Sequence, residues 1–190
     1  MLRVISGSAK GRRLATLRTL ALRPTPDRVR EALFNMLGER IDAAAVLDLF
    51  AGSGAIGLEA LSRGARLAVL VEAHEPACRL IEKNLQRCGL DQPAIVWCSQ
   101  VQHALPALTM QGQAFDVIFL DPPYQTPLLE ETLQRLGDGR LLTADGQVIA
   151  EHFFKRVMPE RYGRLCRVRL ARFGDVALSF YRVEDQEGRV

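Results

Sequence analysis

The feature that most constrains the fold of this 190-residue chain is an alternation of short apolar runs with amphipathic segments. Runs rich in Val, Ile, Leu and Phe predict buried strands, and apolar residues at helical spacing between them predict helices. Such an alternation indicates βαβ units and a doubly wound, mostly parallel sheet. The predicted strands are 46–50, 67–72, 94–97, 115–120 and 146–151, and the predicted helices are 55–62, 76–87, 101–110 and 128–136.

The last part of the chain departs from this alternation. Two further strand-like segments, 164–173 and 176–183, are separated only by Gly174 and Asp175. So short a linker forces an antiparallel hairpin. We therefore predict an α/β fold whose mostly parallel, seven-stranded sheet ends in an antiparallel hairpin. This architecture is typical of Rossmann-like class I methyltransferases, whereas a dinucleotide-binding sheet stays parallel.

A G-x-G-x-x-G motif follows the first predicted strand and opens the first predicted helix. Gly52 and Gly54 would let the backbone turn tightly and approach a ligand, and Gly57 would let the helix pack on the sheet. Glu72 ends the second predicted strand, where a carboxylate can accept hydrogen bonds from both ribose hydroxyls of an adenosine. These features predict an adenosine-containing cofactor and fit either NAD or S-adenosylmethionine.

Two features favour S-adenosylmethionine. Asp48 precedes the glycines, where its carboxylate can hold the loop or the ammonium group of the cofactor, and the segment 121–124 has no role in hydride transfer. Methyltransferases often have an acidic residue at the position of Gln100, and the Gln amide oxygen can accept the same hydrogen bond from the adenine amino group. The predicted cofactor-binding residues are Asp48, Phe50, Ala51, Gly52, Ser53, Gly54, Glu72, Ala73, Gln100 and Val101.

The segment Asp121-Pro122-Pro123-Tyr124 directly follows a dense apolar run. Because prolines cannot continue a strand pairing, the strand should end here, at the sheet edge where α/β proteins bind ligands. The Asp121 carboxylate and the Pro122 carbonyl can accept the two N–H groups of a nucleobase amine. Tyr124 offers a face for stacking an extruded base. We predict that Asp121, Pro122 and Tyr124 are catalytic in methylation of a nucleobase amine.

Charge is distributed unevenly, although the net charge is only +3. Residues 1–40 carry nine Lys/Arg against three Asp/Glu, residues 41–150 carry seven against thirteen, and residues 151–172 carry seven against two. Basic flanks around an acidic middle indicate a polyanionic partner. Composition alone fits ordinary solvated surface charge equally well.

The first forty residues are predicted to form an RNA-binding extension of a methyltransferase domain at 41–190. A small basic β-hairpin is followed by a helix, for which Thr25 is the predicted N-cap and Pro26 the first helical residue. The predicted RNA-binding residues are Lys10, Arg12, Arg13, Arg23, Arg28 and Arg30. For Arg28 and Arg30, ion pairs with nearby carboxylates are the alternative.

Metal, disulfide and membrane signals are weak. The four cysteines form no C-x-x-C pair and the three histidines are scattered, so neither a metal site nor a disulfide is predicted, and the cysteines are expected to be buried free thiols. No apolar run approaches the roughly 20 residues that span a bilayer, and the N-terminus does not open a signal peptide. We expect a cytoplasmic monomer with no membrane partner.

Three blocks of sequence, 23–37, 47–64 and 115–124, resemble the RsmD-type 16S ribosomal RNA guanine-N2 methyltransferases of bacteria. The resemblance extends from residue 2 to about residue 183. Its R-P-T-x-D-R-x-R-E-x-L-F-N block is far more specific than D-P-P-Y, which many amino-methyltransferases share. The resemblance implies methyl transfer from S-adenosylmethionine to N2 of one guanine in 16S rRNA, within an assembling 30S subunit. It also implies that the N-terminal hairpin and the Arg-rich helix start hold RNA.

Three alternatives stay open at this point. D-P-P-Y fits adenine N6 or cytosine N4 of RNA or DNA as well as guanine N2, because all three amines need the same acceptors. A non-catalytic module that binds S-adenosylmethionine or RNA is a second alternative, and a nicotinamide-dependent dehydrogenase is a third. No separate target-recognition domain is visible in the sequence, which disfavours a DNA-modifying enzyme.

Overall fold

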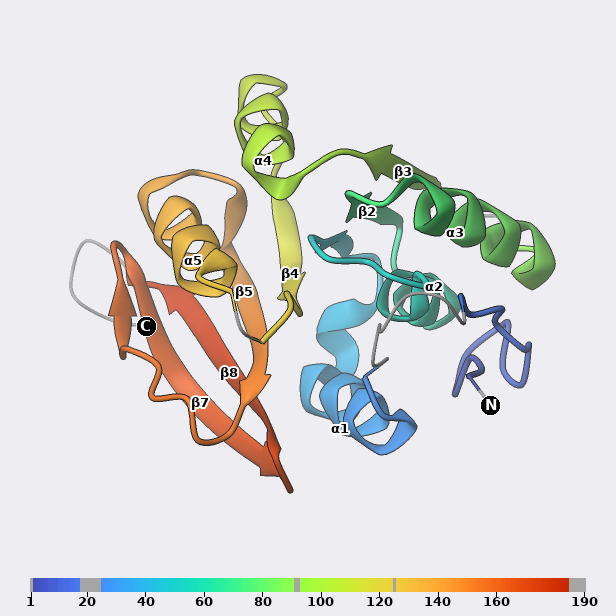
Figure 1. Cartoon of the computed structure of the whole chain (residues 1–190), viewed down its shortest axis with the longest axis horizontal. Coiled ribbons are helices and arrows are strands. Elements are labelled where there is room, and N and C mark those ends of the chain that lie inside the picture. Colours follow the sequence, from blue (N-terminus) through green and yellow to red (C-terminus); the bar gives the residue numbers. More distant parts are fainter. Residues whose placement is uncertain (1, 18–24, 91–92, 125, 185–190) are drawn as a thin grey trace. The chain divides into compact units, whose positions relative to one another are not determined.

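The computed structural model describes residues 2–17, 25–90, 93–124 and 126–184 (Figure 1). The chain divides into two compact units, Met1–Ala104 and Leu105–Val190. The first unit contains the hairpin, the first helix and the glycine motif together. The predicted RNA-binding extension at 1–40 is a functional division, and it stays a prediction. Within the described ranges, no helix is long and apolar enough to cross a membrane.

The first unit contains three parallel strands in the order β3-β2-β1. Their bounds are β1 Ala45–Asp48, β2 Leu67–Glu72 and β3 Ala94–Cys98. Every residue of β1 is buried, as expected for a parallel strand covered on both faces. In the register, Glu72 lies opposite Cys98, so the carboxyl ends of β2 and β3 are side by side.

The helices of the first unit are α1 Asp27–Leu37, the short 3-10 helix η1 Gly38–Ile41, α2 Ala55–Ser62 and α3 Glu75–Cys88. The prediction for the start of α1 was wrong by one position. Pro26 is the N-cap, with extended backbone, and Asp27 is the first helical residue. A carboxylate in the first turn still favours the helix because it faces the positive end of the helix dipole.

The predicted N-terminal hairpin is present as one antiparallel bridge, Arg3 to Arg13, with hydrogen bonds from Leu14 N to Leu2 O (3.0 Å) and Val4 N to Arg12 O (3.0 Å). It has too few residues for a core of its own. The hairpin instead leans on α2. There the side chain of Glu59 and the side chain and carbonyl of Ser62 accept hydrogen bonds from its backbone, at residues 5, 6, 8 and 9.

The second unit contains strands in the order β4-β5-β8-β7-β6. Their bounds are β4 Phe115–Leu120, β5 Leu142–Phe153, β6 Arg161–Tyr162, β7 Leu165–Phe173 and β8 Val176–Val183. The pair β4–β5 is parallel, and the pairs β5–β8, β8–β7 and β7–β6 are antiparallel. The helix α5 Leu128–Asp138 connects β4 to β5, and α4 Val101–Met110 contains the boundary between the units.

These elements confirm the predicted α/β class, with parallel strands followed by antiparallel C-terminal strands. The described ranges contain eight strands, one more than predicted, because the two-residue β6 pairs with the start of β7. β5 begins at Leu142 rather than at Gly146. The register of β5 against β4 shifts between Phe115 and Val117, so Leu142 pairs with Phe115 through an irregularity that the sequence does not signal.

Candidate functional site

The glycine loop connects β1 to α2 in the first unit, as predicted. Gly54 is the N-cap of α2 and has a left-handed φ of 81°. The left-handed backbone favours glycine, and a Cβ atom there would lie 2.6 Å from Cδ1 of Leu58, so that side chain would have to move to admit it. A Cβ on Gly57 would lie 2.6 Å from the Leu70 side chain, which confirms its predicted role in packing α2 on the sheet.

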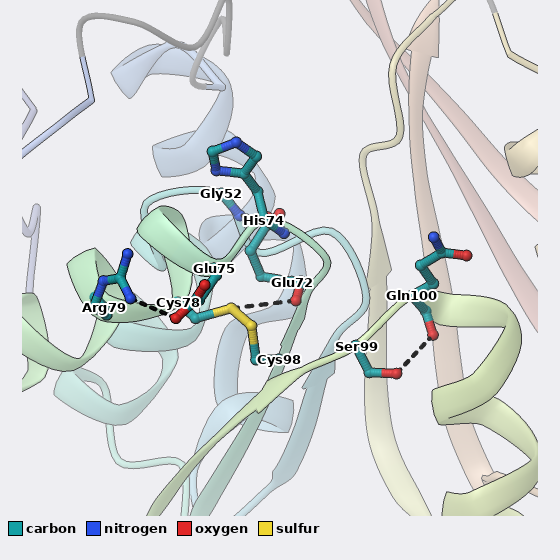
Figure 2. The surroundings of a disulfide bond; sticks show 9 residues. All are labelled: Gly52, Glu72, His74, Glu75, Cys78, Arg79, Cys98, Ser99 and Gln100. Atoms are coloured by element: carbon teal, nitrogen blue, oxygen red, sulfur yellow. Dashed lines mark hydrogen bonds and ion pairs between the residues drawn. A yellow bond between two sulfur atoms is a disulfide. The ribbon is translucent and has the colours of Figure 1, made fainter.

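Glu72 at the end of β2 is fixed against this loop. Its Oε2 accepts a hydrogen bond from Gly52 N (2.8 Å) and its Oε1 accepts one from His74 N (2.8 Å). Figure 2 shows Gly52, Glu72 and His74 together at this edge. The structure thus brings together two parts of the predicted cofactor site that lie twenty positions apart in the sequence.

Asp48 ends β1 and is buried, with 2% of its surface exposed. Burial, with a smaller contribution from the nearby Glu72 carboxylate, raises the pKa of its carboxyl from 3.8 to about 7, against the opposing effect of the backbone N–H groups of Phe50 and Gly57. Among the described residues, Oδ1 has no hydrogen-bond partner. An unpartnered buried carboxylate oxygen costs free energy unless a ligand satisfies it. Asp48 therefore fits a cationic group such as an ammonium.

The other predicted cofactor residues differ in exposure. Gln100 is exposed and lies just before α4, where its carbonyl accepts the N–H groups of His103 and Ala104 in the first turn of the helix. Val101 is buried and Ala73 is exposed. In the glycine loop, Ala51 and Gly54 are buried and Phe50, Gly52 and Ser53 are half-buried.

A disulfide beside these residues corrects the prediction of four free thiols. Cys78 of α3 is bonded to Cys98 at the end of β3, with a Cα–Cα distance of 5.8 Å, whereas Cys88 and Cys166 are free (Figure 2). Cys78 Sγ lies 3.3 Å from the carbonyl oxygen of Glu72. Sequence spacing could not show this pair, because it depends on α3 packing beside β3.

The segment 121–124 follows β4 directly in the second unit. Pro122 is buried, Asp121 is half-buried, and Tyr124 is 40% exposed, so its ring can be reached from solvent. Within the described residues, no N–H or O–H group donates to the carbonyl oxygen of Pro122. Thr126 closes the turn, since its N (3.2 Å) and Oγ1 (2.8 Å) both donate to the carbonyl of Pro123.

Side chains from later in the chain hold this turn, and sequence reasoning missed them. The hydroxyl of Tyr124 donates to Oε1 of Glu151, a buried residue of β5 (3.2 Å). Arg156, just after β5, donates to the carbonyls of Tyr124 (3.3 Å) and Thr126 (3.2 Å) and pairs with Glu130. Nothing in their local sequence marks Glu151 or Arg156, because the contacts depend on the pairing of β4 with β5.

The predicted RNA-binding residues fall into three groups. Lys10, Arg12, Arg13 and Arg28 are exposed on the hairpin and the first turn of α1. Arg23 lies outside the described residues. Arg30 requires a correction. Its side chain is 0% exposed, and its Nη2 donates to the carbonyl of Arg3 and to Asp27 Oδ1 (3.1 Å), so it fastens the hairpin to α1 instead of facing RNA.

Asn84 is a second polar anchor that the sequence reasoning missed. This buried residue of α3 accepts from Ala15 N (2.8 Å) and donates to Ala15 O (3.1 Å) and Ser53 O (2.9 Å). It thereby joins the segment after the hairpin to the glycine loop. A polar residue at a buried position of an amphipathic helix was the available signal. Within the described ranges, no group of His, Cys, Asp and Glu side chains is arranged to hold a metal ion.

Comparison with known proteins gives consistent matches over most of the chain. The family model "Conserved hypothetical protein 95" matches residues 2–182. The chain is 38% identical to the putative rRNA methyltransferase YlbH of Bacillus subtilis, covering 95% of this chain and 98% of that protein. It is 37% identical to the ribosomal RNA small subunit methyltransferase D of Escherichia coli, covering 97% and 91%. The solved structure of the putative methyltransferase yhhF from Escherichia coli has a TM-score of 0.83 at 37% identity, covering 97% and 99%.

Proposed function

The chain belongs to the ribosomal RNA small subunit methyltransferase D family, also described as conserved hypothetical protein 95, and on this premise we propose that it methylates 16S rRNA. The proposed reaction transfers one methyl group from S-adenosylmethionine to the exocyclic N2 amine of a single guanine, in an assembling 30S subunit. The observation that carries the proposal is the Asp121–Tyr124 turn at the end of β4, with a carboxylate, a Pro122 carbonyl that accepts no hydrogen bond from the described residues, and an accessible aromatic ring.

The first unit would hold the cofactor. The buried carboxylate of Asp48 fits the ammonium of the methionine moiety, and Glu72 fits the ribose hydroxyls beside the glycine loop. Gly52 and Gly54 let the backbone approach the ligand without a side chain between them. Gln100 and Val101 would contact the adenine. When bound, S-adenosylmethionine supplies an electrophilic sulfonium methyl group.

The second unit would activate the amine. The N2 lone pair of guanine is delocalised into the ring, so the nitrogen must become pyramidal before it attacks. Acceptors directed at its two N–H groups favour that geometry and stabilise the charge that develops. The Asp121 carboxylate and the Pro122 carbonyl are the proposed acceptors, and Asp121 Oδ receives the proton that the nitrogen loses. Tyr124 would stack on the extruded base.

Methylation of rRNA gives the direct test of this function. We expect purified protein, labelled S-adenosylmethionine and 30S particles from cells that lack this protein to yield one N2-methylguanosine, detected by mass spectrometry of digested rRNA. Asp121→Ala should lower the rate by about 100-fold or more, since transition-state acceptors contribute on this scale, and should leave affinity for S-adenosylhomocysteine within about twofold. Methyladenosine or methylcytidine would identify another amine, and equal labelling by Asp121→Ala would refute the proposed mechanism.

The exposed hairpin residues Arg12 and Arg13 are the proposed RNA contacts with the clearest test. The double variant Arg12→Gln/Arg13→Gln should weaken binding to 16S rRNA and reduce the slope of log K against log salt by about 1 to 2, because each phosphate contact releases a counterion. The matched control neutralises Lys83 and Arg87, two exposed cations of α3, and so removes the same charge. Equal losses in both double variants would indicate general electrostatics instead of a hairpin site.

A further inference from the structure

Arg156 forms hydrogen bonds with the backbone of the turn that carries the proposed catalytic residues. Arg156 follows β5 in a short turn, in which its N donates to the carbonyl of Phe153 (2.9 Å). Its guanidinium then reaches the turn after β4. Nη1 donates to the carbonyl of Tyr124 (3.3 Å), and Nη2 donates to the carbonyl of Thr126 (3.2 Å). One planar group therefore spans two carbonyls of the same turn.

Glu130 orients this guanidinium. Nε of Arg156 donates to Glu130 Oε1 (3.0 Å), and Nη2 also contacts Glu130 Oε2. With both carbonyls included, these contacts occupy four of the five N–H groups that a guanidinium offers. The Arg156 side chain is 22% exposed, so the group lies largely within the unit. A lysine would keep the charge but could not reproduce this planar set of contacts.

Tyr124 is held at two points. Its carbonyl accepts from Arg156, and its hydroxyl donates to the buried carboxylate of Glu151 (3.2 Å). The residue nevertheless stays 40% exposed. A ring fixed at its backbone and its hydroxyl, but open on its surface, has the properties required for stacking a base in one orientation.

We propose that Arg156 and Glu151 are positioning residues that fix the backbone and the aromatic ring of the Asp121–Tyr124 turn for methyl transfer. Arg156 sets the path of the turn and hence the direction of the Asp121 and Pro122 acceptors, and Glu151 sets the orientation of the Tyr124 ring. Neither residue has to touch the substrate. The inference rests on the proposed function, because it assigns a purpose to the shape of that turn.

The molecule contains a matched pair for the test. Arg161 makes a similar two-pronged ion pair with Glu184 in the same unit, with contacts of 2.5 and 3.0 Å, and within the described residues its guanidinium donates to no backbone carbonyl. Arg156→Ala and Arg161→Ala each remove one arginine from one carboxylate. Only Arg156→Ala also releases the turn. A difference between the two variants therefore reports the contacts to the carbonyls of Tyr124 and Thr126.

Three measurements on the full chain define the expected result for Arg156. Arg156→Ala should lower the single-turnover methyl-transfer rate on 30S particles by about tenfold or more, since small displacements of reacting groups are costly. It should speed hydrogen exchange in the peptide spanning 121–127 and leave S-adenosylhomocysteine affinity within about twofold. Arg156→Lys should show the same direction of change and serves if the alanine variant does not fold. Arg161→Ala should change none of the three.

The contribution of Glu151 is tested by a double-mutant cycle. Tyr124→Phe and Glu151→Gln each alter the hydroxyl–carboxylate contact and keep the ring and the side-chain size. If Glu151 acts through Tyr124, the double variant should be no slower than the slower single variant, within about twofold. Multiplied losses would refute this role.

Two outcomes overturn the proposal for Arg156: a methylation rate equal to that of Arg161→Ala, or unchanged exchange in 121–127. Hydrogen exchange needs no activity, so it also separates this proposal from the proposed function. If wild-type protein methylates no rRNA, the proposed function is refuted. Hydrogen exchange in 121–127 would still show whether Arg156 holds the turn.

Discussion

The glycine loop and the Asp121–Tyr124 turn each follow a buried parallel strand, yet they are fixed in different ways. The glycine loop depends on the conformation of its own backbone, although the side chains of Glu72 and Asn84, 20 and 31 positions away, also bind it. Gly54 has a left-handed φ of 81°, and the carboxylate of Glu72 binds the N–H of Gly52. The Asp121–Tyr124 turn is fixed by prolines and by two side chains about thirty residues further along, Glu151 and Arg156.

This difference explains why the sequence predicts the structure of the glycine loop well and that of the Asp121–Tyr124 turn only in part. A backbone-determined loop must carry glycine at the positions that need it, so the motif and the structure coincide. A turn fixed by distant side chains shows its reactive residues in the sequence but conceals its supports. We therefore expect substitutions in the glycine loop to act through steric strain, and substitutions of the residues that support the turn to act by making the turn less ordered.

The largest effect expected on cofactor binding comes from adding a single methyl group to the glycine loop. Gly54→Ala should weaken S-adenosylhomocysteine binding by about 30-fold or more, because left-handed strain of about 1–2 kcal/mol and overpacking of about 1–3 kcal/mol fall on the same loop. Calorimetric titration measures this change. A Cβ there would meet Leu58 at 2.6 Å.

Gly89→Ala is the matched control for that experiment. Gly89 also has a positive φ, 59°, at the end of α3, but a Cβ there would meet no atom within 4 Å. It should cost about 1 kcal/mol of stability from backbone strain alone, with unchanged cofactor affinity. If Gly54→Ala binds the cofactor as well as Gly89→Ala, the glycine loop is not fixed by its backbone and the comparison fails.

A smaller effect on cofactor affinity is expected from titration of the buried Asp48 carboxyl beside that loop. Burial holds the pKa of Asp48 at about 7. A bound ammonium would favour the ionised form, so binding should release a proton below pH 7. Affinity for S-adenosylhomocysteine should therefore be about tenfold weaker at pH 6 than at pH 8. Asp48→Asn should bind more weakly and lose this dependence, and a dependence that persists in this variant would assign the titration to another group.

The same carboxyl affects stability in a defined direction. Its pKa in the folded protein, about 7, is above its usual value of 3.8. Between these values the folded state binds more protons than the unfolded state. The contribution of Asp48 to folding is thus most favourable at low pH and declines as pH rises through 7. Binding of a cation at Oδ1 would offset that loss, which links the cofactor to the stability of the first unit.

Much of the fold could be predicted because local pattern determines it. The bounds of α2, β2, α4, β4 and β8 agree with the predicted ranges, since each element is a mostly apolar segment of the sequence. The start of β5 at Leu142 was missed because it depends on an irregular register with β4. Pro26 occupies the N-cap of α1 instead of the first helical position, a difference of one residue that sequence preference does not resolve.

The sequence marks the proposed reactive residues of the site but not the side chains that support them. Asp48 and Glu72 end strands and Asp121 directly follows one, so their place along the chain could be predicted, whereas their roles stay a prediction. Arg30 was predicted to bind RNA, with an ion pair to a nearby carboxylate as the alternative. The structure shows that ion pair, with Asp27, and buries the side chain where it fastens a hairpin that has no core. Asn84 and Arg156 were missed because their partners are far away in the chain. A charged side chain is not necessarily exposed. Tertiary contacts decide whether it faces solvent or is buried and holds two segments together.

The bond between Cys78 and Cys98 closes a covalent ring that contains most of α3 and all of β3, because the two residues are 20 positions apart. A ring of this size removes chain entropy from the unfolded state that is worth roughly 3 kcal/mol. Oxidised and reduced protein are therefore two thermodynamic species of one sequence. For any measurement of unfolding or ligand affinity on this chain, the thiol–disulfide state of the sample is a variable of the same rank as pH or salt.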